Sequence, residues 1–225
     1  MASGCGRGRV RTRPGDVTDA MRRLIAAAAV VLALSACSDT RAQDEREAPP
    51  LRGAVRTAVF AGGCFWSIEH NFEQIAGVIE AESGFTGGRV DNPTYAQVVR
   101  GGTGHVEAVR VTYDSGRVTY RQLVDRFWRM IDVTDPDGQF CDQGPSYVSA
   151  VYATNAQRPV AEASRRAAVQ AIGDRRFVTP VRTASRFWPA EAYHQDFARR
   201  NPARYRAYSI GCRRAERLRA VWAGR

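Results

Sequence analysis

The sequence contains no lysine, and all 33 of its basic residues are arginine. Histidine is scarce, and the spacing of the three that are present fits no metal site: His70, His105 and His194. No cysteine lies three residues from another, which argues against a dithiol oxidoreductase with a Cys-x-x-Cys motif. The glycine pairs do not form a phosphate-binding loop. We therefore expect no metal and no nucleotide to be required.

Long hydrophobic runs are also missing. The apolar run at residues 24–34 (LIAAAAVVLAL) is too short to cross a bilayer of roughly 30 Å as a helix. Met21-Arg22-Arg23 precedes it, an arrangement typical of a secretory signal. Leu34-Ser35-Ala36-Cys37 follows and resembles the lipobox of bacterial lipoproteins. This resemblance implies that Cys37 is lipidated and that the protein is anchored to the outer membrane, facing the periplasm. An ordinary cleaved signal is the alternative.

Three segments follow from these patterns. Residues 1–36 are interpreted as an upstream extension and a signal peptide, with the start at Met21. Residues 37–54 are polar, charged and proline-bearing, so we expect a flexible tether. Residues 55–225 form the folded domain, with a mobile C-terminal tail.

The net charge of +10 is distributed without a strong basic patch. Several arginines lie in the segment expected to be removed, and most of the others are spread along the chain. We therefore expect an arginine-rich, solvated surface rather than nucleic-acid binding. Contact with a membrane is expected only through the lipid anchor, and the protein is expected to be a monomer.

Strand and helix patterns alternate along the domain. Apolar periodicity predicts strands at 55–60, 78–85, 105–113, 148–153 and 178–184. It predicts helices at 66–75, 118–131, 157–172 and 189–200, with a further helix start at Asn92-Pro93-Thr94. This order indicates an α+β domain of the two-layer βαβ-sandwich kind. Residues 132–147 form a long loop, and such loops are usually functional.

One cysteine lies where the chain must bend. Ala61-Gly62-Gly63-Cys64-Phe65-Trp66 connects a predicted strand to a predicted helix. The positive end of a helix favours a thiolate, so the pKa of Cys64 is expected to be lowered. Phe65 and Trp66 would supply an apolar wall beside it. This pattern indicates a nucleophilic cysteine with an apolar substrate pocket; a buried, inert cysteine is the alternative.

Six motifs, taken in order, resemble the A-type peptide methionine sulfoxide reductases. They cover nearly all of residues 57–205: Gly62-Gly63-Cys64-Phe65-Trp66, Gly87-Gly88 with Asn92-Pro93-Thr94-Tyr95, Thr103-Gly104-His105-Val106-Glu107, Asp142-Gln143-Gly144-Pro145-Ser146-Tyr147, Ala190-Glu191-Ala192-Tyr193-His194-Gln195 and Asn201-Pro202. The resemblance implies an α/β roll around a ferredoxin-like, two-layer βαβ core.

The resemblance also implies the residue roles. Cys64 would attack the sulfoxide sulfur, while Phe65 and Trp66 would hold the methyl group beside that sulfur. Glu107 would be the general acid. Period-two alternation places it on an apolar face of its strand, which should raise its pKa. The remaining site residues would be two phenol donors to the sulfoxide oxygen and a supporting carboxylate: Tyr95, Tyr147 and Asp142.

The implied reaction leaves Cys64 as a sulfenic acid, which a second thiol must resolve. A thioredoxin-like donor would then reduce the disulfide, and no cofactor would be bound. The family takes the S epimer of methionine sulfoxide in proteins and peptides, and free methionine sulfoxide stays open as a second substrate. Three residues depart from the family pattern, and the last stands where many members have the resolving cysteine: Ser67, Phe197 and Arg206. Cys212 on the tail is our first candidate for that role and Cys141 the second; an external thiol is the third.

Two other classes of protein stay open from the sequence. A cysteine hydrolase would need a histidine base, and His105 and His194 are available. A lipid-anchored structural or binding protein of the cell envelope would not need Cys64.

Overall fold

The structure, a computed structural model, describes residues 51–173 and 176–223. The signal peptide, Cys37 and most of the tether lie outside the described residues. Within the described ranges, no helix combines the length and the apolar character that a membrane crossing needs.

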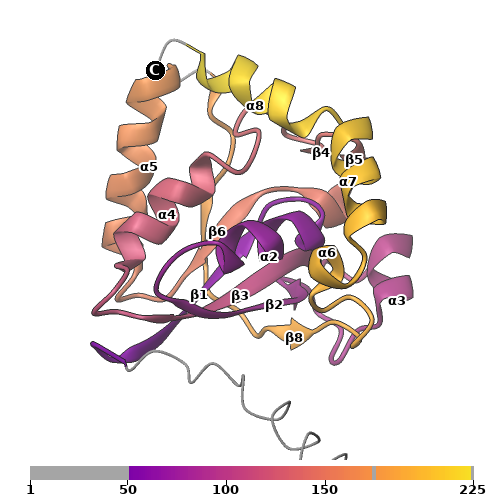
Figure 1. Cartoon of the computed structure of the whole chain (residues 1–225), viewed down its shortest axis with the longest axis horizontal. Helices are drawn as coiled ribbons and strands as arrows, with labels where there is room; N and C mark the ends of the chain where they lie inside the picture. Colours follow the sequence, from indigo (N-terminus) through magenta and orange to yellow (C-terminus); the bar gives the residue numbers. More distant parts are fainter. Residues whose placement is uncertain (1–50, 174–175, 224–225) are drawn as a thin grey trace, which may run out of the picture. The chain divides into compact units, whose positions relative to one another are not determined.

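A six-stranded mixed sheet runs through the domain (Figure 1). Its order is β7-β6-β1-β3-β2-β8. The strands are β1 (Val55–Ala61), β2 (Val78–Thr86), β3 (Val106–Asp114), β6 (Ala150–Ala153), β7 (Val181–Thr183) and β8 (Trp188–Pro189). The β1–β3, β2–β3 and β1–β6 pairs are antiparallel, whereas β7 runs parallel to β6.

Two helices, the first and third in the list that follows, connect the strands of the central unit as crossovers. The helices of the N-terminal two thirds are α2 (Phe65–Glu73), α3 (Tyr95–Arg100), α4 (Tyr120–Trp128) and α5 (Arg158–Ile172). The chain runs β1-α2-β2-β3-α4-β6, and these strands lie in the order β6-β1-β3-β2. This is the ferredoxin-like βαββαβ arrangement. The expected α+β fold with a two-layer core is therefore confirmed.

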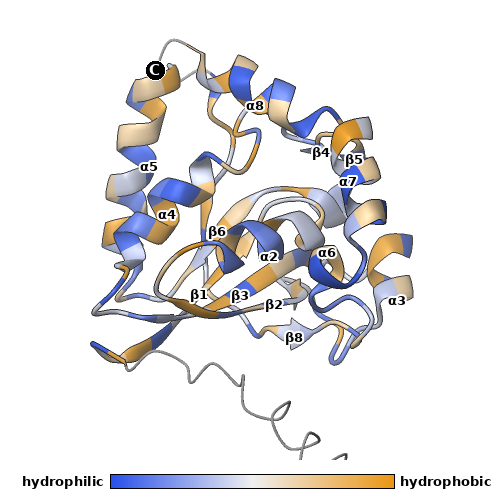
Figure 2. Cartoon of the chain, viewed as in Figure 1, coloured by the Kyte–Doolittle hydropathy of each residue, from blue (hydrophilic) through white to orange (hydrophobic). Residues whose placement is uncertain are grey.

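The main core lies between the sheet and the helices α2, α4 and α5. On β3, Val109 and Val111 face this core, and the Phe60 ring packs 4.7 Å from that of Phe72 and 5.0 Å from that of Phe127. The alternation of blue and orange along α4 in Figure 2 reflects a polar outer face and an apolar inner one. The register of β3 matters for the site, because it places Glu107 on the face that carries Val109 and Val111.

Residues 189–200 do not form the single helix that their pattern predicted. The segment contains β8, a series of turns and the short α6 (Phe197–Arg200). The Gln195 amide holds it against β2: Oε1 accepts from Ser83 N at 2.9 Å and Nε2 donates to Ser83 O at 2.9 Å. Ala190 N also donates to Ser83 O at 2.9 Å. These contacts with the sheet edge override the local helical preference.

The C-terminal tail is helical in this structure, whereas the sequence predicted a mobile tail. It consists of α7 (Pro202–Gly211) and α8 (Arg214–Trp222). Arg217 Nε lies 2.5 Å from Asp132 Oδ2, and Trp222 is buried, with the Arg129 guanidinium 3.9 Å above its ring. These contacts hold the end of the tail against the domain.

Residues 132–147 have more structure than the predicted loop. They contain the short strands β4 (Gly138–Gln139) and β5 (Asp142–Gln143) and a 3-10 helix (Pro145–Tyr147). The side chain of Gln139 is fully buried and bonds in both directions to the backbone of Asp132, at 2.8 and 2.7 Å. The segment is therefore held rigidly beside the end of β1.

Candidate active site

The bend before α2 depends on two glycines. Gly63 has a φ of +75°, and a Cβ there would lie 2.4 Å from the Cβ of Gln139. A Cβ on Gly62 would lie 2.7 Å from Ile68 and 2.9 Å from Ile131. Only glycine fits this close approach of backbone to neighbouring side chains. The turn places Cys64 at the N-cap of α2.

Glu107 meets the start of this helix from the neighbouring strand. Its Oε2 accepts a hydrogen bond of 2.9 Å from the backbone N–H of Phe65. Burial raises the pKa of Glu107 to about 8, although the Phe65 N–H opposes the shift. The carboxyl group is therefore mostly protonated at neutral pH, as its apolar strand face predicted.

The prediction of a lowered pKa for Cys64 is wrong. Burial raises the pKa of this thiol to about 12, and the nearby Glu107 and Asp142 carboxylates add to the shift. The Tyr208 hydroxyl and the Trp66 backbone N–H oppose this shift without reversing it. The first backbone N–H of α2 donates to Glu107. This part of the positive helix end therefore stabilises the Glu107 carboxylate rather than a Cys64 thiolate. In this state Cys64 is a neutral thiol.

Two phenols lie on the other side of Glu107. Tyr95 opens α3 behind a capping box at Thr94, and its backbone N–H donates to Glu191 Oε1 at 3.0 Å. Tyr147 ends the 3-10 helix. The two hydroxyl groups influence one another, and burial together with the charge of Glu107 raises the pKa of both. Both phenols therefore stay protonated and able to donate.

Aromatic rings line the remaining side of the site. Phe65 is 1 % exposed and Trp66 is half-buried. The Trp66 indole N–H donates to His194 Nδ1 at 3.1 Å, and its ring stacks on Phe197 at 3.6 Å between centroids with an interplanar angle of 7°. Phe197 therefore serves as a flat support for Trp66, which needs no hydroxyl group. Sequence reasoning missed this pair of supports, although the motif around His194 marked the segment.

Neither histidine of the hydrolase hypothesis acts on the thiol. Among the described residues, His194 bonds Trp66, and His105 donates from Nε2 to Val90 O at 2.7 Å while its Nδ1 accepts from Gly88 N at 3.2 Å. A cysteine hydrolase needs a histidine within hydrogen-bond reach of the sulfur. The arrangement does not favour that reading.

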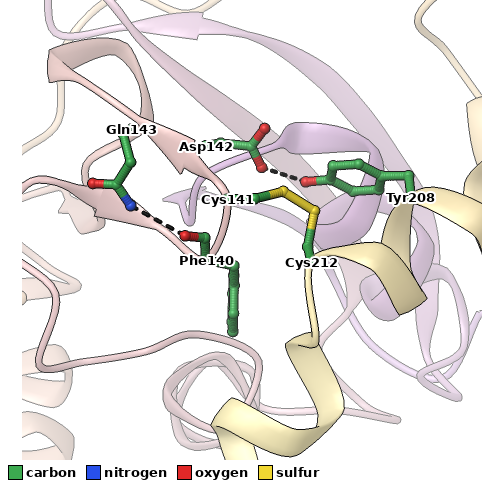
Figure 3. Close-up of a disulfide and its surroundings, with 6 residues drawn as sticks. All are labelled: Phe140, Cys141, Asp142, Gln143, Tyr208 and Cys212. Atoms are coloured by element: carbon green, nitrogen blue, oxygen red, sulfur yellow. Dashed lines mark hydrogen bonds between the residues drawn. A yellow bond between two sulfur atoms is a disulfide. The ribbon is translucent and has the colours of Figure 1, made fainter.

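Asp142 reaches Cys64 together with a residue that the sequence analysis missed. The Tyr208 hydroxyl on α7 donates to Asp142 Oδ2 (Figure 3) and lowers the pKa of the nearby Cys64 thiol. Burial raises the pKa of Asp142, while Tyr208 and Arg214 pull it down. The available signal was the helical spacing between Tyr208 and Cys212, four residues apart. It could have been read only once α7 had been recognised as a helix.

The two candidate resolving cysteines are joined to one another. Cys141 and Cys212 form a disulfide with a Cα–Cα distance of 5.2 Å (Figure 3). Cys64 is a free cysteine. Cys141 is exposed and Cys212 half-buried. Tyr208 and Asp142, each close in sequence to one of these cysteines, link the disulfide to Cys64. In the part of the chain that the structure describes, no group of His, Cys, Asp and Glu side chains is arranged to hold a metal ion.

The fold and the site together define a cysteine-based oxidoreductase. A buried thiol faces a protonated carboxyl group and two phenols, and a separate disulfide lies next to them. The family model for peptide methionine sulfoxide reductase matches residues 56–225. The chain belongs to this family, and its activity is the thiol-dependent reduction of methionine sulfoxide.

Relatives with this activity in their names cover most of the chain. Peptide methionine sulfoxide reductase MsrA 2 of Caulobacter vibrioides is 48% identical over 205 residues, which are 91% of this chain and 100% of the relative. The MsrA of Limosilactobacillus reuteri is 43% identical, over 71% of this chain and 93% of its own. Methionine sulfoxide reductase A of Corynebacterium diphtheriae is a solved structure with 32% identity and a TM-score of 0.58, covering 69% of this chain and 78% of its own.

Proposed function

We propose that the protein reduces the S epimer of methionine sulfoxide in proteins and peptides, with Cys64 as the nucleophile and Glu107 as its proton partner. The observation that carries this proposal is the contact between the N-terminus of α2 and the buried Glu107 carboxyl group, whose pKa lies at about 8. A carboxyl group that is protonated at neutral pH can donate to the sulfoxide oxygen.

The first step moves one oxygen atom and one proton. Glu107 donates its proton to the sulfoxide oxygen, which makes the sulfur electrophilic and leaves a carboxylate. The Cys64 sulfur attacks the sulfoxide sulfur, and its thiol proton passes to that carboxylate. The oxygen, now carrying the proton from Glu107, moves to Cys64: an S–O bond forms on the cysteine while the S–O bond of the sulfoxide breaks. Methionine leaves reduced by two electrons, and Cys64 holds the oxygen as sulfenic acid. The raised pKa of Cys64 keeps the thiol protonated until a base takes its proton, and the Glu107 carboxylate is the base that this step supplies.

The substrate is held by the groups around the thiol. Tyr95 and Tyr147 donate to the oxygen as negative charge develops on it. Phe65 and Trp66 contact the methyl group of the sulfoxide, and Asp142, which accepts from Tyr208, lies near the thiol. The aromatic packing supports this assignment, since Trp66 is fixed in place by Phe197 and His194.

Two cysteines then act in succession. The Cys212 thiolate attacks the Cys64 sulfenic acid: an S–S bond forms, the S–O bond breaks, and hydroxide takes a proton and leaves as water. The Cys141 thiolate next attacks Cys212 in that disulfide and releases Cys64 as a thiolate. The product is the Cys141–Cys212 disulfide, and its presence supports a relay that uses both cysteines. A thioredoxin-like dithiol would then reduce it at the exposed Cys141.

Mass spectrometry after one turnover without reductant tests the order. We expect Cys141→Ala to release methionine normally and to accumulate a Cys64–Cys212 disulfide. Cys212→Ala should accumulate the sulfenic acid on Cys64. A Cys64–Cys141 disulfide in the wild type would show that Cys141 attacks first. If Cys64→Ser keeps full activity, Cys64 is not the nucleophile.

We also propose that the protein acts as a monomer in the cell envelope, anchored by a lipid on Cys37 to the outer membrane and facing the periplasm. The lipobox-like Leu34-Ser35-Ala36-Cys37 after a short apolar run supports this location. Labelling with a fatty-acid analogue should modify the wild type and spare Cys37→Ser. Equal labelling of both would contradict the anchor, and an ordinary cleaved signal would leave both unlabelled.

A further inference from the structure

A buried arginine next to the disulfide has no hydrogen-bonding counter-ion. Arg214 opens α8, and the residue is only 5 % exposed. Among the described residues, neither Nη1 nor Nη2 of its guanidinium group has a hydrogen-bond partner. A buried charge without a partner is strongly unfavourable, so proteins rarely keep one unless another state of the molecule supplies the partner.

The position of this charge is defined by three neighbours of the disulfide. The guanidinium lies 3.9 Å above the ring of Phe140, which precedes Cys141. It acts on Asp142, which follows Cys141, and on Tyr208, which is one turn before Cys212. Arg214 itself is two residues after Cys212. The guanidinium group therefore lies among residues that flank the two cysteines, without a hydrogen-bonded counter-ion among the described residues.

The other charged groups nearby already have partners. The Asp142 carboxylate accepts from Tyr208, the Asp132 carboxylate is bonded to Arg217, and Arg213 is paired with Glu216. Asp135 lines the same pocket of about 360 Å³ as the disulfide, and its carboxylate accepts from the Asp137 backbone and the Gln143 amide. Cys212 lies between the C-terminus of α7 and the N-terminus of α8, whose dipoles have opposite signs. The positive charge of Arg214 is therefore the side-chain charge that remains to lower the pKa of a thiol at this position.

We propose that Arg214 is a positioning residue for the resolving thiols: its guanidinium group becomes the counter-ion of the first thiolate that the Cys141–Cys212 pair forms on reduction. This inference rests on the proposed function, in which that thiolate attacks the Cys64 sulfenic acid. The disulfide form carries no negative charge on sulfur, so Arg214 is left without a partner in the oxidised protein and gains one in the reduced protein. In disulfide exchange the thiolate is the attacking nucleophile, and a thiol with a lower pKa is also the better leaving group.

Site-resolved alkylation of the reduced full chain tests the proposal. Cys64→Ser is used as the background, and iodoacetamide labelling of the peptides containing Cys141 and Cys212 is followed against pH. We expect the more reactive of the two thiols to have a midpoint below the value of about 8.5 for a free cysteine. Arg214→Gln should raise this midpoint by about one unit and slow labelling at pH 7 about tenfold, while Arg214→Lys should keep much of the effect.

Arg213→Gln is the matched control. Arg213 is adjacent to Cys212 in sequence, but its side chain is 73% exposed and already paired with Glu216. It should leave the midpoint unchanged. Equal midpoints in Arg214→Gln and Arg213→Gln would overturn the proposal. If Arg214→Gln does not fold, the wild-type midpoint decides alone, and a value at or above about 8.5 would overturn it.

A second readout uses the intact catalytic cysteine. After a single turnover without reductant, Arg214→Gln should release one methionine per enzyme and accumulate the Cys64 sulfenic acid, which dimedone traps. Rapid disulfide formation in this variant would contradict the role of Arg214. Loss of the methionine itself, in the wild type as well as in the variants, would contradict the proposed function instead, so the two failures are distinguishable.

Discussion

At the residue scale, the chemistry depends on where two protons lie. Cys64 and Glu107 are both buried, and this burial raises the pKa of each, so at neutral pH both are mostly neutral; the charge that Glu107 carries when ionised raises the pKa of Cys64 further. An enzyme that needed only a nucleophilic cysteine would lower the pKa of its thiol. Here the substrate needs a proton as much as it needs a nucleophile, and the coupled pair can supply both from one site.

The pH dependence of the first turnover follows from Glu107. Its pKa is raised to about 8, so the donating acid is present below that pH and is lost as the pH rises through it. We expect methionine release to fall above about pH 8 and Glu107→Gln to lower its rate by a factor of about 10² to 10⁴. Single-turnover kinetics between pH 6 and 10 measure both effects. Glu80→Gln, at an exposed position on β2, is the control, and a flat profile across pH 8 would contradict the role of Glu107.

At the element scale, the junction between β1 and α2 and the helix α7 position the thiol from two sides. The junction is fixed by backbone packing, because Gly63 lies against Gln139 in the 132–147 segment. The helix α7 is different: none of its residues is buried, and it reaches the site through Tyr208 and through the disulfide at its C-cap. The packing of Gly63 against Gln139 is set during folding. The attachment of α7 through the disulfide depends on the redox state of Cys141 and Cys212.

A methyl group at Gly63 should disrupt the junction. Gly63→Ala combines a positive φ with a Cβ only 2.4 Å from another Cβ, and we expect it to lower the free energy of unfolding by about 2–4 kcal/mol. Gly101→Ala is the matched control: its φ is also positive, at +87°, but a Cβ there meets nothing within 4 Å. Urea unfolding compares the two. Equal losses would mean that strain at φ, and not the clash, limits the position.

Removing the phenol of α7 should slow the chemistry without unfolding the protein. In Tyr208→Phe, Asp142 loses its hydrogen-bond donor and Cys64 loses a group that lowers its pKa; hydrogen bonds to charged groups contribute about 1.5–3 kcal/mol. We expect the first turnover to slow about tenfold or more. Tyr205→Phe, one turn earlier on α7 and packed against His70, should change little. If the two variants behave alike, Tyr208 only packs against the site.

At the scale of the whole molecule, one disulfide ties the tail to the body of the domain. Cys141 and Cys212 are 71 residues apart in sequence, and the loop between them contains β6, α5, β7, α6 and α7. A cross-link across so long a loop restricts the unfolded chain strongly. The catalytic cycle therefore also alters the stability of the molecule, through the formation and reduction of this bond.

We expect the oxidised protein to exceed the double variant Cys141→Ala, Cys212→Ala by about 2–4 kcal/mol in free energy of unfolding. Urea denaturation with and without a reductant measures the difference, and the reduced wild type should fall close to the double variant. Single variants serve as controls, since each leaves one thiol without a cross-link. An unchanged midpoint on reduction would mean that α7 and α8 are held by packing alone.

The sequence by itself determined the elements and most of the site. The period-two pattern of β3 placed Glu107 on the buried face, and Gly62-Gly63 before Cys64 marked the bend, because both depend on local backbone geometry. The motif order led to the family, and the family fold followed. The roles of Tyr95, Tyr147 and Asp142 stay predictions, although the structure brings all three to Cys64 and Glu107.

Only the tertiary structure decided the ionisation of Cys64, the pairing of Cys141 with Cys212 and the places of Tyr208 and Arg214. A helix N-terminus suggested a thiolate, but burial and two carboxylates from distant segments determine the pKa. Residues 189–200 carried a helical pattern, yet their bonds to β2 prevent a single helix. Each of these outcomes depends on groups far apart in the chain, whose desolvation and contacts exist only once the chain has folded.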